Sequence, residues 1–163
     1  MTLPNTVIIS QALSHLKHIA PTGYAVGLHI RFTTPRIMFV TYPEVWLTLY
    51  GREGLLMKDP TVRWGMSRPG VLDWSRIDEA MDPDGVMSRA ADHGLRYGFS
   101  CARQDPVPSL AGFARSDRPF TESEISEAVE LFERLHELTR EETAFDAAEL
   151  AELQAHAEAL RTR

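Results

Sequence analysis

The sequence predicts an α/β protein of the α+β type: an α-β-α sandwich, in which helices cover both faces of a central antiparallel sheet of about five strands. Two observations predict this class. Segments whose apolar residues alternate, as in strands, are joined by short turns, which favours antiparallel pairing. Segments with the 3.6-residue apolar period of helices precede, separate and follow them. The chain has 163 residues, of which 44% are hydrophobic, enough for one domain with a substantial core.

The first third of the chain is predicted to contain a helix, a hairpin and a second helix. Residues 5–20 carry an apolar helical stripe that Pro21-Thr22-Gly23 ends. Residues 24–32 alternate apolar and polar side chains, as a half-buried strand does, and residues 36–40 form the returning strand after a short turn. Pro43 then opens a helix, in the first-turn position that proline tolerates.

The middle of the chain alternates short helices and strands. Asp59 is the predicted N-cap of a short helix that begins at Pro60. A helix over residues 82–93 is stopped by Gly94. The remaining predicted strands are residues 71–72, 97–102 and 109–116.

Two capping boxes mark the start of the last two helices. In Thr121-x-x-Glu124 and Asp146-x-x-Glu149, a short polar side chain precedes an acidic one by three residues, so that each can bond the backbone N–H of the other. An apolar stripe follows each box, at residues 125, 128, 129, 132, 135 and 138 of the first helix and at residues 150, 153, 157 and 160 of the second.

Composition excludes several classes of function. The net charge of −6 provides no basic face for phosphates, so these residues by themselves are not expected to bind nucleic acid. The single cysteine, Cys101, excludes an intrachain disulfide framework and is typical of a protein in a reducing cytoplasm. No apolar stretch approaches the ~18 residues of a transmembrane helix, and the N-terminus has no signal-peptide pattern. We therefore expect a cytoplasmic protein with no membrane contact.

The sequence has no motif that indicates catalysis or metal binding. It contains neither a Gly-x-Ser-x-Gly motif nor a P-loop. His15 and His18 lie three residues apart, but a third ligand is not near them in sequence, and surface histidines are the simpler interpretation. Cys101 lies in a predicted strand, where a small buried hydrophobe is more common than a nucleophile. We expect no enzyme, no metal and no cofactor.

The most informative pattern is a row of polar aromatic residues followed by an aspartate. Tyr42, Trp46 and Tyr50 are four residues apart, so on a helix they lie on one face. Their phenol O–H and indole N–H groups need partners if buried, which a face meant only for packing would avoid. Asp59 follows and adds a charged acceptor. Taken singly, Asp59 is most simply an N-cap and the others core aromatics, but their joint spacing predicts a buried recognition surface for a small polar group.

The stretch from Tyr42 to Trp74 resembles a known ligand-binding domain. Its pattern Tyr-x3-Trp-x3-Tyr-x8-Asp-Pro-x13-Trp is similar to that of the LuxR-type autoinducer-binding domain, which reads acyl-homoserine lactones in quorum sensing. Residues 93–100 (HGLRYGFS) resemble the helix-to-strand turn of that family, and residues 112–125 (GFARSDRPFTESEI) resemble its last strand and the start of its long helix. The resemblance covers residues 1–142, the predicted autoinducer-binding domain.

The resemblance implies a ligand between the sheet and one helical layer, with roles for individual residues. Trp46 would donate to the lactone carbonyl, Tyr42 would donate to the amide carbonyl, and Asp59 would accept the amide N–H; the donor and acceptor types agree with these roles. Gly112 aligns with a position where many relatives carry a Ser or Thr that helps to bind the first acyl carbons. The missing hydroxyl weakens the expectation that a 3-oxo group is recognised. Support and lining would come from Tyr50, Thr61, Trp74, Leu56, Met87 and Phe99.

The resemblance also implies partners. Residues 143–163 resemble the first helix of the LuxR-type DNA-binding domain, and the sequence ends before the recognition helix, so DNA binding would need a C-terminal domain absent from this chain. The protein would be the sensor domain of a transcription regulator that forms a homodimer, or a heterodimer with LuxR-type regulators, through the stripe of residues 125–138. The alternative is a ligand-independent interaction protein or decoy that dimerises with full-length LuxR-type regulators.

Overall fold

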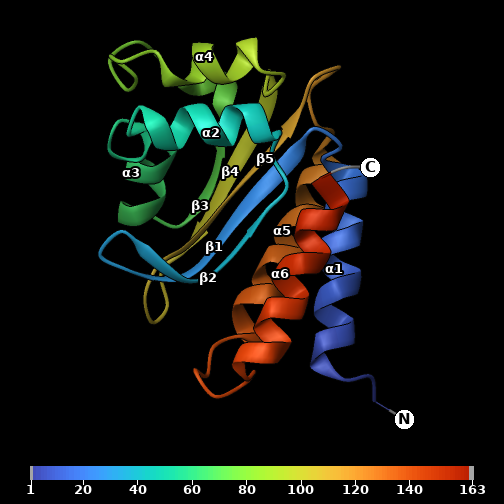
Figure 1. Ribbon diagram of the computed structural model, residues 1–163. Coiled ribbons are helices and arrows are strands. Elements are labelled where there is room, and N and C mark those ends of the chain that lie inside the picture. The colour runs from blue at the N-terminus through green and yellow to red at the C-terminus, as the bar shows by residue number, and fades with distance from the viewer. Residues whose placement is uncertain (1, 162–163) are drawn as a thin grey trace.

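The computed structural model describes residues 2–161 as an α-β-α sandwich around a five-stranded sheet (Figure 1). The strands are β1 (Gly23–Arg31), β2 (Thr34–Val40), β3 (Gly70–Asp73), β4 (Tyr97–Arg103) and β5 (Ser109–Arg115). Their order in the sheet is β2-β1-β5-β4-β3, and every neighbouring pair is antiparallel. The predicted fold class is confirmed.

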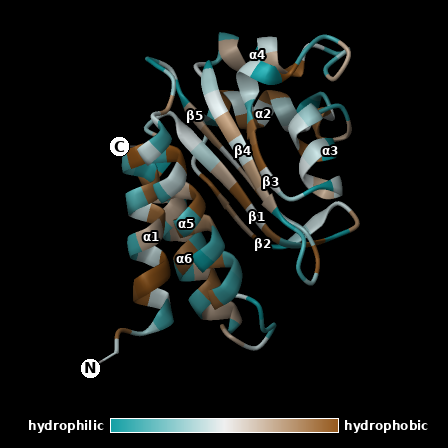
Figure 2. Cartoon of the chain, turned by 180° about the vertical axis from the view of Figure 1, so that it is seen from behind, coloured by the Kyte–Doolittle hydropathy of each residue, from teal (hydrophilic) through white to brown (hydrophobic). Residues whose placement is uncertain are grey.

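Two groups of helices cover the two faces of the sheet, as the front and back views both show (Figures 1 and 2). One face carries the longer helices α1 (Asn5–Ile19), α5 (Glu122–Leu138) and α6 (Ala147–Arg161). The other face carries α2 (Glu44–Arg52), α3 (Pro60–Ser67) and α4 (Val86–Asp92), together with the short 3₁₀ helices η1 (Leu55–Met57) and η2 (Trp74–Arg76). None of the helices within residues 2–161 has the length and apolar character needed to cross a membrane.

Most predicted elements agree with the structure to within about two residues at each end. The exception is the helix expected over residues 82–93, which begins only at Val86. Gly85 precedes it in the left-handed conformation, with a φ of 66°, so the helix cannot extend back through this residue. Asp82 instead caps the helix from outside, because its carboxylate accepts the backbone N–H groups of Val86 and Met87, both at 2.9 Å.

Both predicted capping boxes are present. The Thr121 hydroxyl accepts the Glu124 N–H at 3.1 Å, and the Glu124 carboxylate accepts the Thr121 N–H at 2.9 Å. Asp146 and Glu149 form the same pair of bonds at the start of α6, at 2.8 and 3.0 Å. Helices α5 and α6 therefore begin where the sequence places them.

The apolar stripes of α5 and α6 pack against the protein's own core. On α5, Ala128, Phe132 and Leu135 are fully buried, and the other apolar residues of the stripe are partly buried against the same core. The choice of residues 125–138 as a pairing surface is therefore wrong, because this stripe already packs against α1 and the sheet. Helix α6 packs against α1 and β2 and adds three buried residues to this core: Leu153, Ala157 and Leu160.

The two faces of the sheet carry side chains of very different size. Large residues of β1, β4 and β5 fill the core beneath α1, α5 and α6: Tyr24, Val26, Leu28, Phe99 and Phe113. The residues that alternate with them, on the opposite face, are small: Ala25, Gly27, Ser100 and Gly112. A sheet face covered with small side chains leaves space between itself and the helices that cross it.

A buried polar cluster ties the C-terminal end of α5 to the sheet. The His29 Nε2 lies 3.0 Å from the Thr139 Oγ1, and the Ser109 Oγ lies 2.7 Å from the His136 Nδ1. Burial, followed by the neighbouring His136 and Arg36, lowers the pKa of His29 to about 4, and burial also lowers the pKa of His136. Both imidazoles are therefore neutral at neutral pH. Ser109 and His136 are fully buried, so this serine–histidine contact is structural.

Candidate functional site

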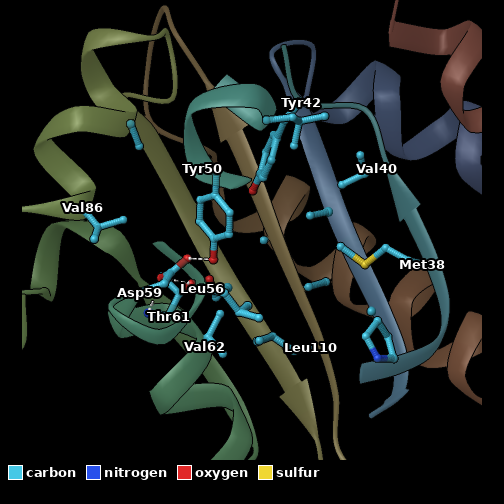
Figure 3. Close-up of a pocket in the computed structure, with 18 of the residues that line it drawn as sticks. Met38, Val40, Tyr42, Tyr50, Leu56, Asp59, Thr61, Val62, Val86 and Leu110 are labelled. Atoms are coloured by element: carbon cyan, nitrogen blue, oxygen red, sulfur yellow. Dashed lines mark hydrogen bonds between the residues drawn. The ribbon is translucent and has the colours of Figure 1, made fainter. Parts of the chain in front are cut away.

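A cavity of about 240 Å³ lies between the small-residue face of the sheet and helices α2, α3 and α4 (Figure 3). Polar side chains gather where α2 and the start of α3 face the sheet. In Figure 3, Tyr50, Asp59 and Thr61 lie across the cavity from Met38 and Val40. The apolar part of the lining includes Gly27, Ile30, Met38, Val62, Met66 and Leu110. The cavity therefore has a polar end and an apolar end.

Asp59 is fixed at the polar end by the helix that it caps. One carboxylate oxygen accepts the backbone N–H and the hydroxyl of Thr61, at 2.8 and 2.7 Å, and the other accepts the Tyr50 hydroxyl at 2.8 Å. Pro60 occupies the first turn of α3. Backbone N–H groups in this turn have no partner within the helix, so proline, which lacks an N–H, costs no hydrogen bond there. A carboxylate offers about four acceptor positions. Asp59, which lines the cavity, therefore has capacity for one more donor.

Tyr42 and Trp46 supply hydrogen-bond donors that no residue within 2–161 accepts. Both side chains line the cavity and are buried, with 8% and 3% of their surface exposed. The Trp46 ring lies between Tyr50 and His93, with ring centroids 5.7 and 5.6 Å away, so its position is set by packing. Neither donor atom is among the buried unpartnered atoms of residues 2–161, so both face the open space of the cavity. These two groups can therefore gain from an acceptor placed in the cavity.

The phenols of the site remain protonated. Burial, and then the nearby Asp59 carboxylate, raise the pKa values of Tyr42 and Tyr50 above their ordinary value. The physical reason is that a phenolate in a low-dielectric interior next to an anion is doubly disfavoured. The polar end thus combines one fixed anionic acceptor with O–H and N–H donors.

Trp74 and Ser100 form a second polar pair in the cavity wall. The Trp74 ring packs directly on β4, since a β-carbon at Gly98 would lie 2.3 Å from it. The Trp74 indole N–H donates to the Ser100 Oγ at 2.9 Å. Ser100 is 1% exposed and lines the cavity, although the sequence analysis did not identify it.

Gly112 makes room for the Tyr42 hydroxyl. A β-carbon at this position would lie 2.8 Å from the Tyr42 oxygen and 3.7 Å from the Ser100 Oγ. Ser100 and Gly112 are directly paired across β4 and β5. A hydroxyl of the neighbouring strand therefore lies beside Gly112, which has none of its own.

The apolar end of the cavity reaches the surface of the protein. Phe32 and Met38, which belong to the β1–β2 hairpin, line the cavity and are 94% and 40% exposed. Leu56 of η1 also lines it and is 38% exposed. A long apolar group that starts at the polar end would find a continuous apolar lining toward this opening.

Most residues predicted from the sequence line this cavity: Tyr42, Trp46, Tyr50, Leu56, Asp59, Thr61, Trp74, Met87 and Gly112. Whether they bind a ligand stays a prediction. Phe99 does not line the cavity, and its expected place there is wrong. It stacks on Phe113 at 4.9 Å and meets Phe120 edge-on at 4.9 Å, on the opposite face of the sheet. Consecutive strand residues point to opposite faces, so the placement of Phe99 in the core puts Ser100 in the cavity.

Comparisons with known proteins agree with this architecture. The family model described as the autoinducer binding domain matches residues 23–141. No curated protein sequence matches the chain. Solved structures of similar fold include "SdiA in complex with octanoyl-rac-glycerol", at 18% identity and a TM-score of 0.56, over 95% of this chain and 76% of that one.

Two further structures extend the comparison. Escherichia coli SdiA is 22% identical with a TM-score of 0.59, over 86% of this chain, which spans 62% of the SdiA chain. CepR2 of Burkholderia cenocepacia, an N-acylhomoserine lactone-dependent LuxR family transcription factor, is 20% identical with a TM-score of 0.50, over 96% of this chain and 97% of that one. At these identities the structures show a shared fold. The family match is broader evidence, because it includes all five strands and the helices around the cavity. The chain therefore belongs to the autoinducer-binding domain family of LuxR-type regulators.

Proposed function

We propose that this domain is a non-catalytic sensor that binds an acyl-homoserine lactone, or a similar acylated signal, in the cavity. The observation that carries the proposal is the polar end of the cavity. There, the Tyr42 O–H and the Trp46 N–H face the cavity without an acceptor among residues 2–161, next to the Asp59 carboxylate. An acyl-homoserine lactone offers two carbonyl acceptors, one amide donor and an apolar tail, which matches these groups in number and kind.

Each polar group of the ligand then has one partner. The Trp46 N–H donates to the lactone carbonyl, the Tyr42 O–H donates to the amide carbonyl, and Asp59 accepts the amide N–H. The bond to Asp59 contributes most, since a hydrogen bond to a charged group is worth about 1.5–3 kcal/mol net. The tail lies along the apolar lining toward Met38, where each buried methylene adds about 0.8 kcal/mol.

Ligand occupancy would be coupled to the stability of the domain. The cavity lies between the sheet and the whole layer of α2, α3 and α4, so a bound molecule supplies packing that the empty protein lacks. A ligand that binds only the folded state stabilises it by RT ln(1 + [L]/Kd), about 2.7 kcal/mol at a hundredfold excess over Kd. A ligand-independent interaction protein would not need such a cavity.

The experiment is a thermal-melting series with the purified protein and a panel of ligands. The panel contains acyl-homoserine lactones of several tail lengths, an aryl lactone, and 1-octanoylglycerol, the class of compound bound in the SdiA structure. We expect at least one lactone to raise the melting temperature, and mass spectrometry of the protein as purified to identify any signal that it retains. An unchanged melting temperature across all lactones, with a rise for the glycerol ester, would replace the lactone by a monoacylglycerol. No response to any compound would refute the sensor proposal.

The regulatory role extends the same proposal to partners. We propose that the domain acts in a dimer of LuxR-type regulators in the cytoplasm, with DNA contacted through a helix-turn-helix domain. The pairing surface would lie outside the buried stripe of α5. Sedimentation of the ligand-bound protein tests the pairing, and a strict monomer at high concentration would contradict it.

A further inference from the structure

We infer that His29 is a positioning residue for the tail of the ligand. Its left-handed backbone turns over the end of β1, so that Ile30 and Phe32 face the cavity and contact the far carbons of a long acyl chain. The inference rests on the proposed function, because it concerns the same cavity. It adds to that proposal a residue that does not itself line the cavity.

Two residues of the β1–β2 hairpin have an unusual backbone conformation. His29 and Phe32 have φ values of 56° and 60°, and within residues 2–161 they are the only residues other than glycine with a positive φ. This left-handed conformation is unfavourable for a residue with a β-carbon, and it persists only where the surrounding structure holds it. Phe32 lies in the two-residue turn between the paired Arg31 and Thr34, where glycine is the usual residue. Both positions belong to the hairpin that borders the opening of the cavity.

The left-handed backbone at His29 reverses the alternation of β1. Before it, Gly27 lines the cavity and Leu28 lies in the core on the opposite face. Regular alternation would place residue 29 in the cavity wall and residue 30 in the core. Instead, the His29 side chain lies against the end of α5, and Ile30 and Phe32 line the cavity. The pairing with β2 keeps its register across this point, so the change of face comes from the backbone conformation and not from an inserted residue.

Strand β5 and helix α5 hold His29 in this conformation. Its backbone N–H donates to the Ser109 side-chain oxygen at 2.9 Å. Its Nε2 lies 3.0 Å from the Thr139 Oγ1, and that hydroxyl donates its own proton to the Leu135 carbonyl at 2.6 Å, so the imidazole is the donor to Thr139. His29 is 3% exposed. The buried imidazole is thus anchored on α5, and the anchored residue orients the two cavity residues that follow it.

Ile30 and Phe32 supply apolar surface at the end of the cavity farthest from the polar groups. Ile30 is buried, whereas Phe32 is 94% exposed although it lines the cavity. An aromatic ring that is left in water gains from any apolar group that covers it. The groups proposed to bind the lactone lie on α2 and at the start of α3. We expect a short tail to stop before this hairpin and a long tail to reach it.

A His29 that only stabilises the fold makes a different prediction. Every replacement removes the imidazole and its bond to Thr139, so every replacement would weaken all ligands alike. A positioning role depends instead on the backbone. Glycine adopts a positive φ freely, whereas a β-branched valine strongly disfavours it. His29→Gly and His29→Val therefore lose the same side-chain bonds and differ in the direction of the residues that follow.

The test measures the affinities of N-butanoyl- and N-decanoyl-homoserine lactone for the wild-type protein and for each variant. We expect the wild type to prefer the decanoyl compound and His29→Gly to keep this preference. His29→Val should reduce the ratio of the two affinities about 15-fold, the effect of two buried methylenes at about fourfold each. Phe32→Gly, which suits the turn but lacks the ring, should also reduce the ratio. Met57→Ala is the matched control, because Met57 is 72% exposed and does not line the cavity.

The outcomes are distinguishable from a failure of the proposed function. Equal affinity of the wild type for the two lactones, the same ratio in His29→Gly and His29→Val, or an unchanged ratio in Phe32→Gly would each overturn the inference and leave the sensor proposal intact. If His29→Val does not fold, His29→Ala takes its place, because alanine also disfavours a positive φ. Binding of neither lactone by the wild type would refute the lactone as the ligand, and this inference with it.

Discussion

Replacement of Asp59 by asparagine should remove most of the lactone affinity and leave the domain folded. The capping oxygen survives the change, so the bonds from the Thr61 N–H and hydroxyl, at 2.8 and 2.7 Å, are retained. Asparagine is as good an N-cap as aspartate. The second oxygen becomes an NH₂ group, which can donate to the Tyr50 oxygen in place of the present bond. The same NH₂ group cannot accept the amide N–H of a ligand.

The magnitude follows from the lost acceptor. A hydrogen bond to a charged group contributes about 1.5–3 kcal/mol, and 1.4 kcal/mol is a factor of ten, so the affinity should fall about 10- to 150-fold. Asp59→Ala would be a less informative variant. It also removes the cap of α3, at about 1 kcal/mol, and leaves the buried Tyr50 hydroxyl without an acceptor, at about 1–3 kcal/mol. Asparagine therefore separates ligand recognition from folding.

The assay is a titration of each variant with the lactone that stabilises the wild type most, together with a thermal melt without ligand. Asp73→Asn is the matched control, because Asp73 caps η2 by accepting the Ser75 N–H at 2.9 Å and does not line the cavity. We expect wild-type affinity in this control. Wild-type affinity in Asp59→Asn as well would show that Asp59 only caps α3, and would refute the assignment of the site.

The remaining predictions concern Trp46, Gly98 and the buried histidines. Trp46→Phe should weaken lactone binding by about three- to tenfold, because it removes the N–H that no residue within 2–161 accepts, and the smaller ring should also lower stability through lost packing on Tyr50 and His93. Trp64→Phe on α3, outside the cavity lining, is the control in the same titration. Gly98→Ala should lower the free energy of unfolding by about 1–3 kcal/mol, since its β-carbon would lie 2.3 Å from the Trp74 ring and 2.6 Å from the Phe113 carbonyl oxygen. Urea unfolding measures this, and Gly51→Ala in α2, where a β-carbon meets nothing within 4 Å, should not destabilise. Stability should fall as the pH is lowered from about 6.5, where the unfolded histidine takes up a proton, to about 4, the pKa of His29 in the folded protein. The slope should reach about 1.4 kcal/mol per pH unit for each neutral buried histidine, and urea unfolding that is independent of pH across this window would contradict the prediction.

The sequence by itself determined the features that depend on neighbouring residues. The periods of the apolar residues predicted the helices, the strands and the sandwich, because a helix or strand needs one continuous face to bury. The boxes at Thr121 and Asp146 and the cap at Asp59 were predicted correctly, since each bond joins groups two or three residues apart. The row of Tyr42, Trp46 and Tyr50 was visible for the same reason, as one face of one helix.

The tertiary structure determined which of these helix and strand faces pack against each other. Alternation along β4 leaves two choices, and only the packing of Phe99 on Phe113 places Ser100 in the cavity. From the sequence alone, the apolar stripe of α5 could have packed against a partner or against the protein's own core. In the structure it packs against α1 and the sheet, in the core. The cavity exists because the small residues of three strands lie side by side, which no single segment reveals. Whether a polar group has a partner depends on atoms far away in the chain, and so only the fold shows that Tyr50 bonds Asp59 while Tyr42 and Trp46 have no acceptor among residues 2–161.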